Sequence, residues 1–600
     1  MADQNSSYSN VINRRRFIEL TGVTGASALA GCGGGSTDSG GADNSSDGST
    51  DDGDSTDNST DNGSGEMQVH DAALTDFTNQ IVPANQQFNA FNPTNNAPNN
   101  LLFDDWVRYN YEEGSFIPNA ISDWSHNGST FEMTVREGLT WDDGDPVTAE
   151  DFVVHLRLLR TVGEPVWEYT ESVEAADDRT VILNFSETPN PTLLKHQLFG
   201  ANQVQYKASK YKQFVGDSEG LAQFSDQDPI ASGPWSLESA GQQKLVMSRR
   251  EDHPDSENIN FSRTEKSFIE SNQAVQQALM SGGLDSANNL FVPPRVVANF
   301  PDTVTEARLP NKWGLGITFN HEDRHVGNRK VRQAIAHAIN REAVVNNAGP
   351  RTKSTPDVLT GIPAGDQERW IGDEMDSYRT YGKDSRNTDR VDQLMDEAGY
   401  SKDSGTWKDD NGNPVELPLL VPAGWSDWVS GVQTAADQLS QAGFNASADA
   451  RSYGSLGGQA WTQGEFRMTA FYWLPGGARS AFPYFGLEHQ LVHSSETINH
   501  GYPDEVTVPE RTGSGEITVT PADRLNELTT TTDDATIQEI VHQQAWVANV
   551  DLPMMPLTEK RIQVWLTDDE WDIPEEGSSK YQVNQPISWL PRQGDLSYSG

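Results

Sequence analysis

Apolar and polar residues alternate over short stretches of this chain in the way that half-buried strands require. Residues 131–136 and residues 312–320 show this alternation, and each stretch predicts a strand. Two short apolar runs, at 181–185 and 245–248, predict further strands because turn residues bound them. Residues 67–106, in contrast, are predicted to be loop-rich.

Four other segments place apolar residues three or four positions apart, which predicts amphipathic helices. These segments are residues 149–159, 329–345, 388–398 and 432–441. A capping box precedes the first, with Thr148 as N-cap and Asp151 three residues on. Gly399 and Gly443 follow the last two, as glycine commonly does at a helix C-terminus. Because strands and helices are interleaved, we expect α/β domains.

The first 32 residues have the layout of an export signal. Arg14 to Arg16 precede a small, apolar run over 20–31, whose twelve residues are too few for a spanning helix of ~20. The arginines resemble a twin-arginine signal, and Leu29-Ala30-Gly31 before the single cysteine, Cys32, resembles a lipobox. We therefore expect residues 1–31 to be removed, and Cys32 to carry a lipid at the extracellular face of the membrane.

Residues 33–66 form an acidic tract that we expect to stay disordered. The tract contains nine carboxylates, no cation and almost no apolar side chain. It cannot bury enough surface to offset its ordering entropy. We expect it to act as a flexible tether between Cys32 and the folded residues.

The remaining chain is acidic too, and this charge excludes some partners. The formal net charge is −45, and 29 arginines outnumber 14 lysines. Nucleic acid is not expected as a partner, because phosphate binding needs a basic face. Charge spread so widely opposes folding unless salt screens it, and in this respect the chain resembles haloarchaeal proteins.

Four stretches together resemble one known family. They are residues 141–152 (WDDGDPVTAEDF), 232–235 (SGPW), 331–341 (VRQAIAHAINR) and 394–400 (LMDEAGY). In this order they resemble the peptide/nickel group of extracellular solute-binding proteins, called solute-binding family 5. The resemblance covers most of residues 67–600.

The resemblance implies a two-lobed α/β fold of the periplasmic-binding-protein kind, a type II Venus flytrap. It places the first lobe at 67–309 plus 546–600, with an extra subdomain at about 107–225, and the second lobe at 310–545. It also implies a lipid-anchored monomer that closes around a small solute, oligopeptide or oligosaccharide, and hands it to the permease of an ABC importer. No cofactor and no enzyme activity are expected.

The resemblance also points to one segment of the second lobe as a solute contact. In peptide-binding relatives it runs Trp-x-x-Asp-Tyr, and its carboxylate grips the peptide's amino terminus. Here Trp473 matches the aromatic residue, whereas Gly476 stands in place of the aspartate. This departure, together with 16 tryptophans, favours an uncharged or sugar-like solute, which needs aromatic platforms more than carboxylates.

Further ligand-binding candidates lie in predicted loops or match cleft positions of the family. They are Phe88, Asn89, Trp167, Tyr169, Trp313, Trp425, Trp428 and Tyr472. For each aromatic residue the alternative is that it fills the core.

Two other functions compete with solute binding. His321-Glu322-Asp323-Arg324-His325 matches the H-E-x-x-H pattern of zinc hydrolases, which works only on a helix that puts both histidines on one face. Here the pattern lies between a predicted strand and a predicted helix, so we expect a loop and no metal. The other alternative is a surface adhesion module, which would not close around a solute.

Overall fold

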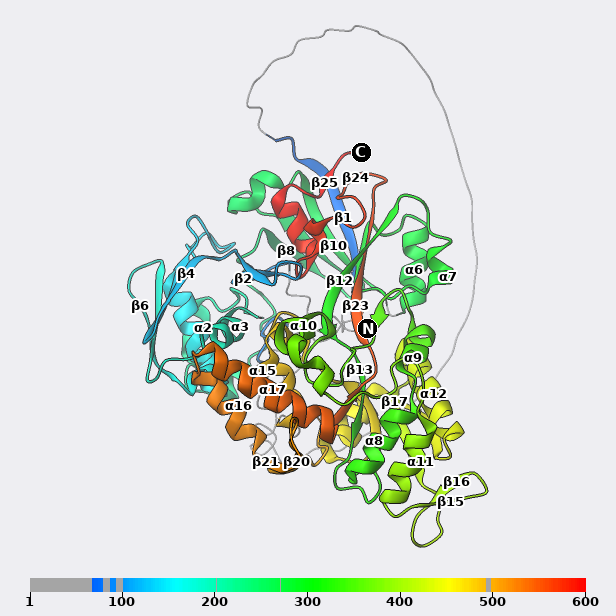
Figure 1. The fold of residues 1–600 in the computed structure, drawn as a ribbon. Helices are drawn as coiled ribbons and strands as arrows, with labels where there is room; N and C mark the ends of the chain where they lie inside the picture. Colours follow the sequence, from blue (N-terminus) through cyan, green and yellow to red (C-terminus); the bar gives the residue numbers. More distant parts are fainter. Residues whose placement is uncertain (1–66, 79–86, 93–100, 201, 270, 493–497) are drawn as a thin grey trace, which may run out of the picture.

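The computed structural model describes residues 67–78, 87–92, 101–200, 202–269, 271–492 and 498–600. Figure 1 shows the sheets near both ends of the chain in its upper half, a cyan subdomain on the left and a second α/β part below. Two strands, β12 (Val304–Trp313) and β23 (Glu559–Thr567), run from the upper part down toward the lower one.

The first sheet begins with a strand that the sequence patterns did not predict. Its order is β1-β10-β9-β8, with β1 (His70–Thr78) parallel to β10 (Phe261–Phe268), followed by β9 (Lys244–Arg249) and β8 (Trp235–Ala240). The expectation that 67–106 is loop-rich is therefore wrong at β1. Its strand conformation depends on pairing with β10, nearly 200 residues away, and not on local alternation.

The subdomain is a four-stranded antiparallel sheet covered by helices. The order is β4-β5-β7-β6, and the elements are β4 (Ile121–Asn127), β5 (Thr130–Val135), β6 (Thr170–Ala175), β7 (Thr180–Phe185), α2 (Ala149–Val162) and α3 (Pro191–Phe199). The strands predicted at 131–136 and 181–185 are confirmed. The capping box is confirmed too, since the Thr148 amide donates to the Asp151 carboxylate over 2.8 Å.

The second part of the fold is built on a five-stranded mixed sheet of order β18-β17-β19-β13-β22. Its strands are β13 (Leu315–Phe319), β17 (Glu416–Pro422), β18 (Asn445–Arg451), β19 (Met468–Tyr472) and β22 (Met554–Pro556). The strand predicted over 312–320 is in fact two strands, because β12 ends at Trp313 in one sheet and β13 starts at Leu315 in the other.

The helix predicted over 329–345 is wrong as a single helix. The structure divides it into α8 (Arg329–Ala338) and α9 (Arg341–Ala348). Ile339 between them has an extended backbone, and the Asn340 side chain caps α9 by accepting a hydrogen bond from an amide of its first turn. The apolar spacing continues across the break, so periodicity alone could not reveal it.

The other predicted helices are present. The helix predicted at 388–398 is α11 (Thr388–Glu397), and the one at 432–441 is α12 (Ser426–Gln441), which starts earlier than predicted. Gly399 and Gly443 both have positive φ, as the glycine after a helix requires.

Helices α15 (Pro483–Leu491), α16 (Pro521–Thr530) and α17 (Asp534–Asp551) lie beside the subdomain in Figure 1. The amide of Asn190, before α3, donates to the carbonyl of Thr529 in α16 over 2.7 Å. The predicted boundary at 545/546 falls within α17. The chain instead changes sheet between β22 and β23.

The remaining elements complete the two parts. The strands are β2 (Val107–Asn110), β3 (Ser115–Pro118), β11 (Ser286–Asn288), β14 (Lys353–Ser354), β15 (Ser401–Asp403), β16 (Thr406–Lys408), β20 (Val506–Pro509), β21 (Glu516–Val519), β24 (Trp571–Asp572) and β25 (Ser597–Tyr598). The helices are α4 (Ala208–Tyr211), α5 (Ser218–Gln223), α6 (Asn272–Met280), α7 (Pro294–Val297), α10 (Gln367–Ile371), α13 (Tyr453–Ser455), α14 (Trp461–Gln463) and α18 (Pro586–Trp589).

Candidate functional site

Two adjacent chain crossings connect the first-part sheets to the second. The outgoing crossing passes from β12 to β13 through Gly314, and the returning crossing passes from β22 to β23 through Thr558. A Cβ at Gly314 would overlap the carbonyl oxygen of Thr558, so only glycine allows this approach. The crossings place Trp313 at the boundary between the two parts.

A group of aromatic rings from three segments of the second part gathers around Trp313. The ring centroids of Trp313 and Trp428 are 5.3 Å apart, and those of Trp313 and Tyr472 are 6.2 Å apart with nearly parallel planes. Trp425 meets Trp428 edge to face at 4.6 Å and lies 5.5 Å from Tyr453. We call these five residues the aromatic wall.

The aromatic wall is open to solvent at one end. Trp313 and Trp428 are buried, Trp425 and Tyr472 are half-buried, and Tyr453 is 54% exposed. Aromatic faces that are held in place yet accessible can stack on the flat apolar faces of a solute. The exposed end is therefore the part of the wall that can receive a ligand.

Tyr453 was missed by sequence reasoning, because no motif marks it. Tyr453 is the first residue of α13, and a single π-helical turn, Leu456–Ala460, comes directly after this helix. Such turns are rare and occur frequently at functional sites. The available signal in the sequence was the Gly457-Gly458 pair between two aromatic residues, Tyr453 and Trp461.

Gly476 lies directly against the wall. Its φ is +88°, and a Cβ there would be 3.4 Å from Cδ1 of Trp313. Its amide donates to the hydroxyl of Ser480 over 2.7 Å. An aspartate at this position would have a strained backbone, because a φ of +88° favours glycine. The positive φ is thus a geometric reason for the glycine at this position.

Three charged side chains are buried behind the wall. Lys560 Nζ lies 5.8 Å from the centroid of the Trp313 ring, and Lys353 Nζ lies 3.0 Å from Oδ2 of Asp427. Burial lowers the pKa of Lys560 to about 8, although Asp427 acts in the opposite direction. Burial favours the neutral form of Asp427, but the two lysines hold its pKa below the usual value. The buried charges therefore lie directly behind the Trp313 ring of the aromatic wall.

Of the residues proposed from the sequence, five meet at this place: Trp313, Trp425, Trp428, Tyr472 and Gly476. Trp473 lies next to them but is fully buried, and its indole N–H donates to the carbonyl of Thr558 over 2.9 Å. This hydrogen bond links the residue after β19 to Thr558 in the returning crossing.

The first-lobe candidates lie elsewhere. Phe88 belongs to the first-lobe core, and the buried Asn89 amide donates to the carbonyl of Leu221 over 2.7 Å. The half-buried Trp167 donates to the carbonyl of Leu156, while the buried Tyr169 hydroxyl is bonded to Gln197. The structure does not bring these four residues to the aromatic wall, and Cys32 lies outside the described residues.

The H-E-x-x-H segment is a turn region, as expected. His325 Nδ1 lies 2.9 Å from the Tyr400 hydroxyl, and burial lowers the pKa of His321 well below its usual value. Across the described ranges, no group of three or more His, Cys, Asp or Glu side chains is arranged to hold a metal.

Solved structures share this fold. A periplasmic oligopeptide-binding protein of Thermotoga maritima, solved with mannohexaose bound, matches with a TM-score of 0.71 at 21% identity, over 88% of this chain and 99% of its own. The likeness shows the two-lobed α/β architecture of periplasmic binding proteins.

The family follows from the sequence comparison. The model of bacterial extracellular solute-binding proteins, family 5 middle region, matches residues 98–490, and this chain belongs to that family. A probable peptide ABC transporter periplasmic-binding protein of Sinorhizobium fredii is 23% identical over 358 residues, 56% of this chain. The nickel-binding periplasmic protein of Escherichia coli is 23% identical over 378 residues, 58% of this chain. The matches cover 63% and 66% of these relatives, just under two thirds of their length.

Proposed function

We propose that this protein is the solute-binding component of an ABC importer and not an enzyme. The observation that carries the proposal is the aromatic wall at the paired crossings, because solute held there contacts the junction that must bend when two lobes close. Solute can then stabilise the closed form, which is the form that a permease would receive.

We favour an oligosaccharide or an oligopeptide without a free amino-terminal anchor as the solute. Gly476 supplies no carboxylate, whereas Trp425 and Tyr453 supply stacking faces. The Thermotoga maritima protein was solved with mannohexaose, and the Sinorhizobium fredii relative is described as a probable peptide transporter component. The family thus supports both solute classes, and the aromatic wall favours the first.

We further propose that a lipid on Cys32 holds the protein at the extracellular face of the membrane. The acidic tether would connect this lipid to the folded residues. Within the described part of the chain, no helix has the length and apolar composition needed to cross a bilayer. Two acyl chains give stable attachment, whereas one gives only marginal binding. Processing before Cys32 would be visible as the intact mass of the membrane-extracted protein.

A thermal-shift panel of oligosaccharides and oligopeptides tests the proposed function. A solute at 100 times its Kd adds about 2.7 kcal/mol to the free energy of unfolding. We expect a member of the panel to raise the unfolding temperature of the wild type, and Trp425→Ala to lose most of that shift. Trp124→Ala is the matched control, because Trp124 is half-buried on β4 away from the wall. A panel without any shift, or equal shifts in both variants, contradicts the proposal.

A further inference from the structure

One helix of the subdomain contributes side chains to two different cores. On α3, Leu194, Leu198 and Phe199 pack into the core of the subdomain. The neighbouring Leu193 belongs instead to the core formed by α15, α16 and α17. Leu193 and Leu194 are both 0% exposed. The helix α3 therefore joins the subdomain to the second part of the fold.

Aromatic rings extend this contact along α3. His196 stacks on Phe482, with centroids 6.1 Å apart and planes 14° from parallel. His196 also lies 6.4 Å from Phe485, and Phe482 meets Trp370 edge to face at 5.5 Å. We call these four residues and Leu193 the α3 contact. Its surfaces are mainly apolar and aromatic, so they stabilise a conformation only while they are packed together.

The helix opposite α3 is bonded to the sheet of the second part. In α15, Nε2 of His489 lies 2.9 Å from the carbonyl oxygen of Tyr472, at the end of β19. Gln490 donates to the carbonyl of Trp473 over 3.0 Å. Phe485 on α15 is thus connected to the strand end that carries Tyr472 of the aromatic wall. The α3 contact therefore spans the two bodies that approach each other when the lobes close.

Buried polar atoms at and beside the α3 contact lack hydrogen-bond partners among the described residues. They are Nδ2 of Asn190, Nδ1 of His196, Nε1 of Trp370 and Nε of Arg479. Arg479 belongs with them because its stem lies against Gly200, the residue after α3. A buried polar atom without a partner is costly in a core that never opens. Surfaces that meet water in another conformation explain why these polar atoms are kept here.

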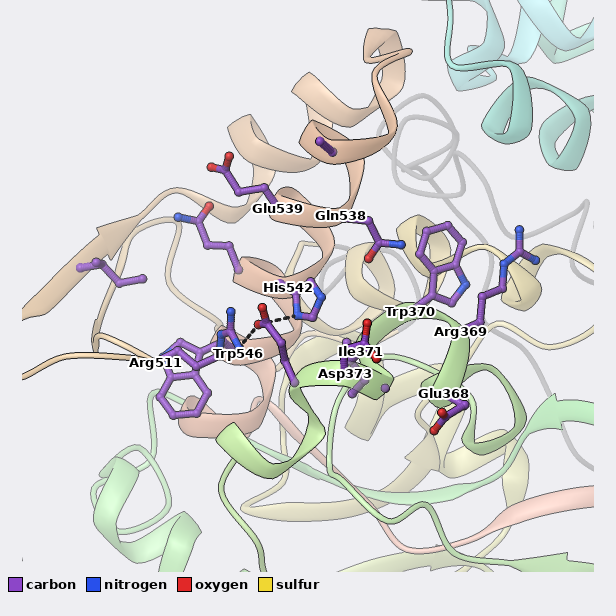
Figure 2. A pocket seen from close by; sticks show the side chains of 15 residues that line it. Glu368, Arg369, Trp370, Ile371, Asp373, Arg511, Gln538, Glu539, His542 and Trp546 are labelled. Atoms are coloured by element: carbon purple, nitrogen blue, oxygen red, sulfur yellow. Dashed lines mark ion pairs between the residues drawn. The ribbon is translucent and has the colours of Figure 1, made fainter.

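A charged cavity borders the α3 contact at Trp370. Figure 2 shows Arg369 and Trp370 at one side of this cavity, which has a volume of about 680 Å³, and Arg511 and Trp546 at the other. Four carboxylates also line it, those of Glu368, Asp373, Glu374 and Glu539. Charged groups stay hydrated where they can. The apolar contact therefore ends at the Trp370 ring, where water reaches its edge.

We infer that α3 is a conformational latch, whose contact with α15 and α10 forms when the lobes close and separates when they open. The inference rests on the proposed solute-binding function and adds to it a contact that stabilises the closed form from outside the aromatic wall. A contact made only in the closed form raises the population of that form. It thereby raises the affinity for any solute that needs closure, although no latch residue belongs to the wall.

Thiol labelling with a maleimide tests the latch on the full chain, because Cys32 is its single cysteine and the wild type gives the baseline. Leu193→Cys places a thiol in the α3 contact, whereas Leu194→Cys and Leu487→Cys place one in the core on either side. All three leucines are 0% exposed, so only opening of the contact distinguishes them. We expect Leu193→Cys to react at least tenfold faster than both controls. His196→Cys, a second probe of the contact, should react like Leu193→Cys.

Solute then connects the latch to lobe closure. The panel member that raises the unfolding temperature should slow the labelling of Leu193→Cys at least tenfold and leave both controls unchanged. Leu193→Ala should weaken the binding of that solute at least fivefold, while Leu194→Ala keeps the affinity.

The outcomes separate the latch from the proposed function. Equally slow labelling of the contact and control thiols overturns the latch, because the contact then does not open. Fast labelling that a bound solute does not slow also overturns it and leaves the proposed function standing. If no panel member binds, the proposed function fails, and the latch stands or falls on the labelling rates alone.

Discussion

Lys560 lies on β23, the strand that follows the returning crossing, and its side chain lies against Trp313 of the aromatic wall. It stands opposite Trp313 in the pairing of β12 with β23, and opposite Lys353 in the pairing of β14 with β23. Its ammonium group is buried between the Trp313 ring and Asp427, where the charged form loses its hydration. The ring of Trp313 thus lies over a buried lysine ammonium group.

Lys560→Met is expected to remove a pH dependence of stability. Burial lowers the folded-state pKa of Lys560 to about 8, against 10.5 for an ordinary lysine. Between these values the folded chain has released a proton that the unfolded chain keeps, so stability rises with pH in this window. Urea unfolding at pH 8 and pH 10 should show a smaller rise in Lys560→Met than in the wild type. The exposed Lys580→Met is the control, and an unchanged rise in Lys560→Met contradicts the assignment.

Elements of both lobes show how much of the fold the sequence patterns predict. The capped helix α2 and the glycine-terminated helices α11 and α12 follow local rules, and all three were predicted. The break between α8 and α9 was not, because Ile339 continues the apolar spacing while its backbone is extended. The division of 312–320 at Gly314 was missed for a similar reason, since only tertiary contact with Thr558 shows that two sheets meet there.

The candidate site was predictable only in part. Trp425 and Trp428 were proposed because they lie in a predicted loop, whereas Trp313 and Tyr472 were proposed from the resemblance to the family. Nothing in the sequence shows that the Trp473 indole donates a hydrogen bond to the Thr558 carbonyl. The hydrogen bond from the Asn89 side chain to the Leu221 carbonyl is equally invisible in the sequence. Side-chain direction at a strand end depends on what packs around it, which a single sequence does not contain.

Gly314→Ala is expected to destabilise the paired crossings. The added Cβ would overlap the Thr558 carbonyl oxygen, and neither backbone can move without shifting a sheet. Overpacking of this kind costs about 1–3 kcal/mol. Gly365→Ala is the matched control, because nothing lies within 4 Å of a Cβ built there. Equal unfolding free energies for the two variants would contradict the close approach at Gly314.

At the scale of the whole molecule, the end of the chain is locked into the first lobe by buried ions. Arg592 contacts Asp104 over 2.6 Å and donates from Nε to Asp255 over 2.6 Å, and all three side chains are buried. The ion pair between Arg592 and Asp104 links segments almost 490 residues apart in the sequence. These ion pairs hold the segment around Arg592 against the first lobe.

Arg592→Ala should therefore unfold the first lobe at lower denaturant. Removing one member of a buried ion pair leaves the other charge uncompensated, which costs about 3–5 kcal/mol. Arg263→Ala is the control, since its partners Asp71 and Glu238 are exposed and such pairs contribute little. Chemical unfolding followed by circular dichroism measures both; similar midpoints for the two variants would refute the lock.

Lobe closure on solute is the central claim of this account, and small-angle scattering tests it most directly. Curves are recorded with and without a saturating amount of the solute identified by thermal shift, for the wild type and for Trp425→Ala. We predict that solute reduces the radius of gyration of the wild type and leaves that of Trp425→Ala unchanged at the same concentration. Identical wild-type curves with and without bound solute would contradict a closing two-lobed binding protein.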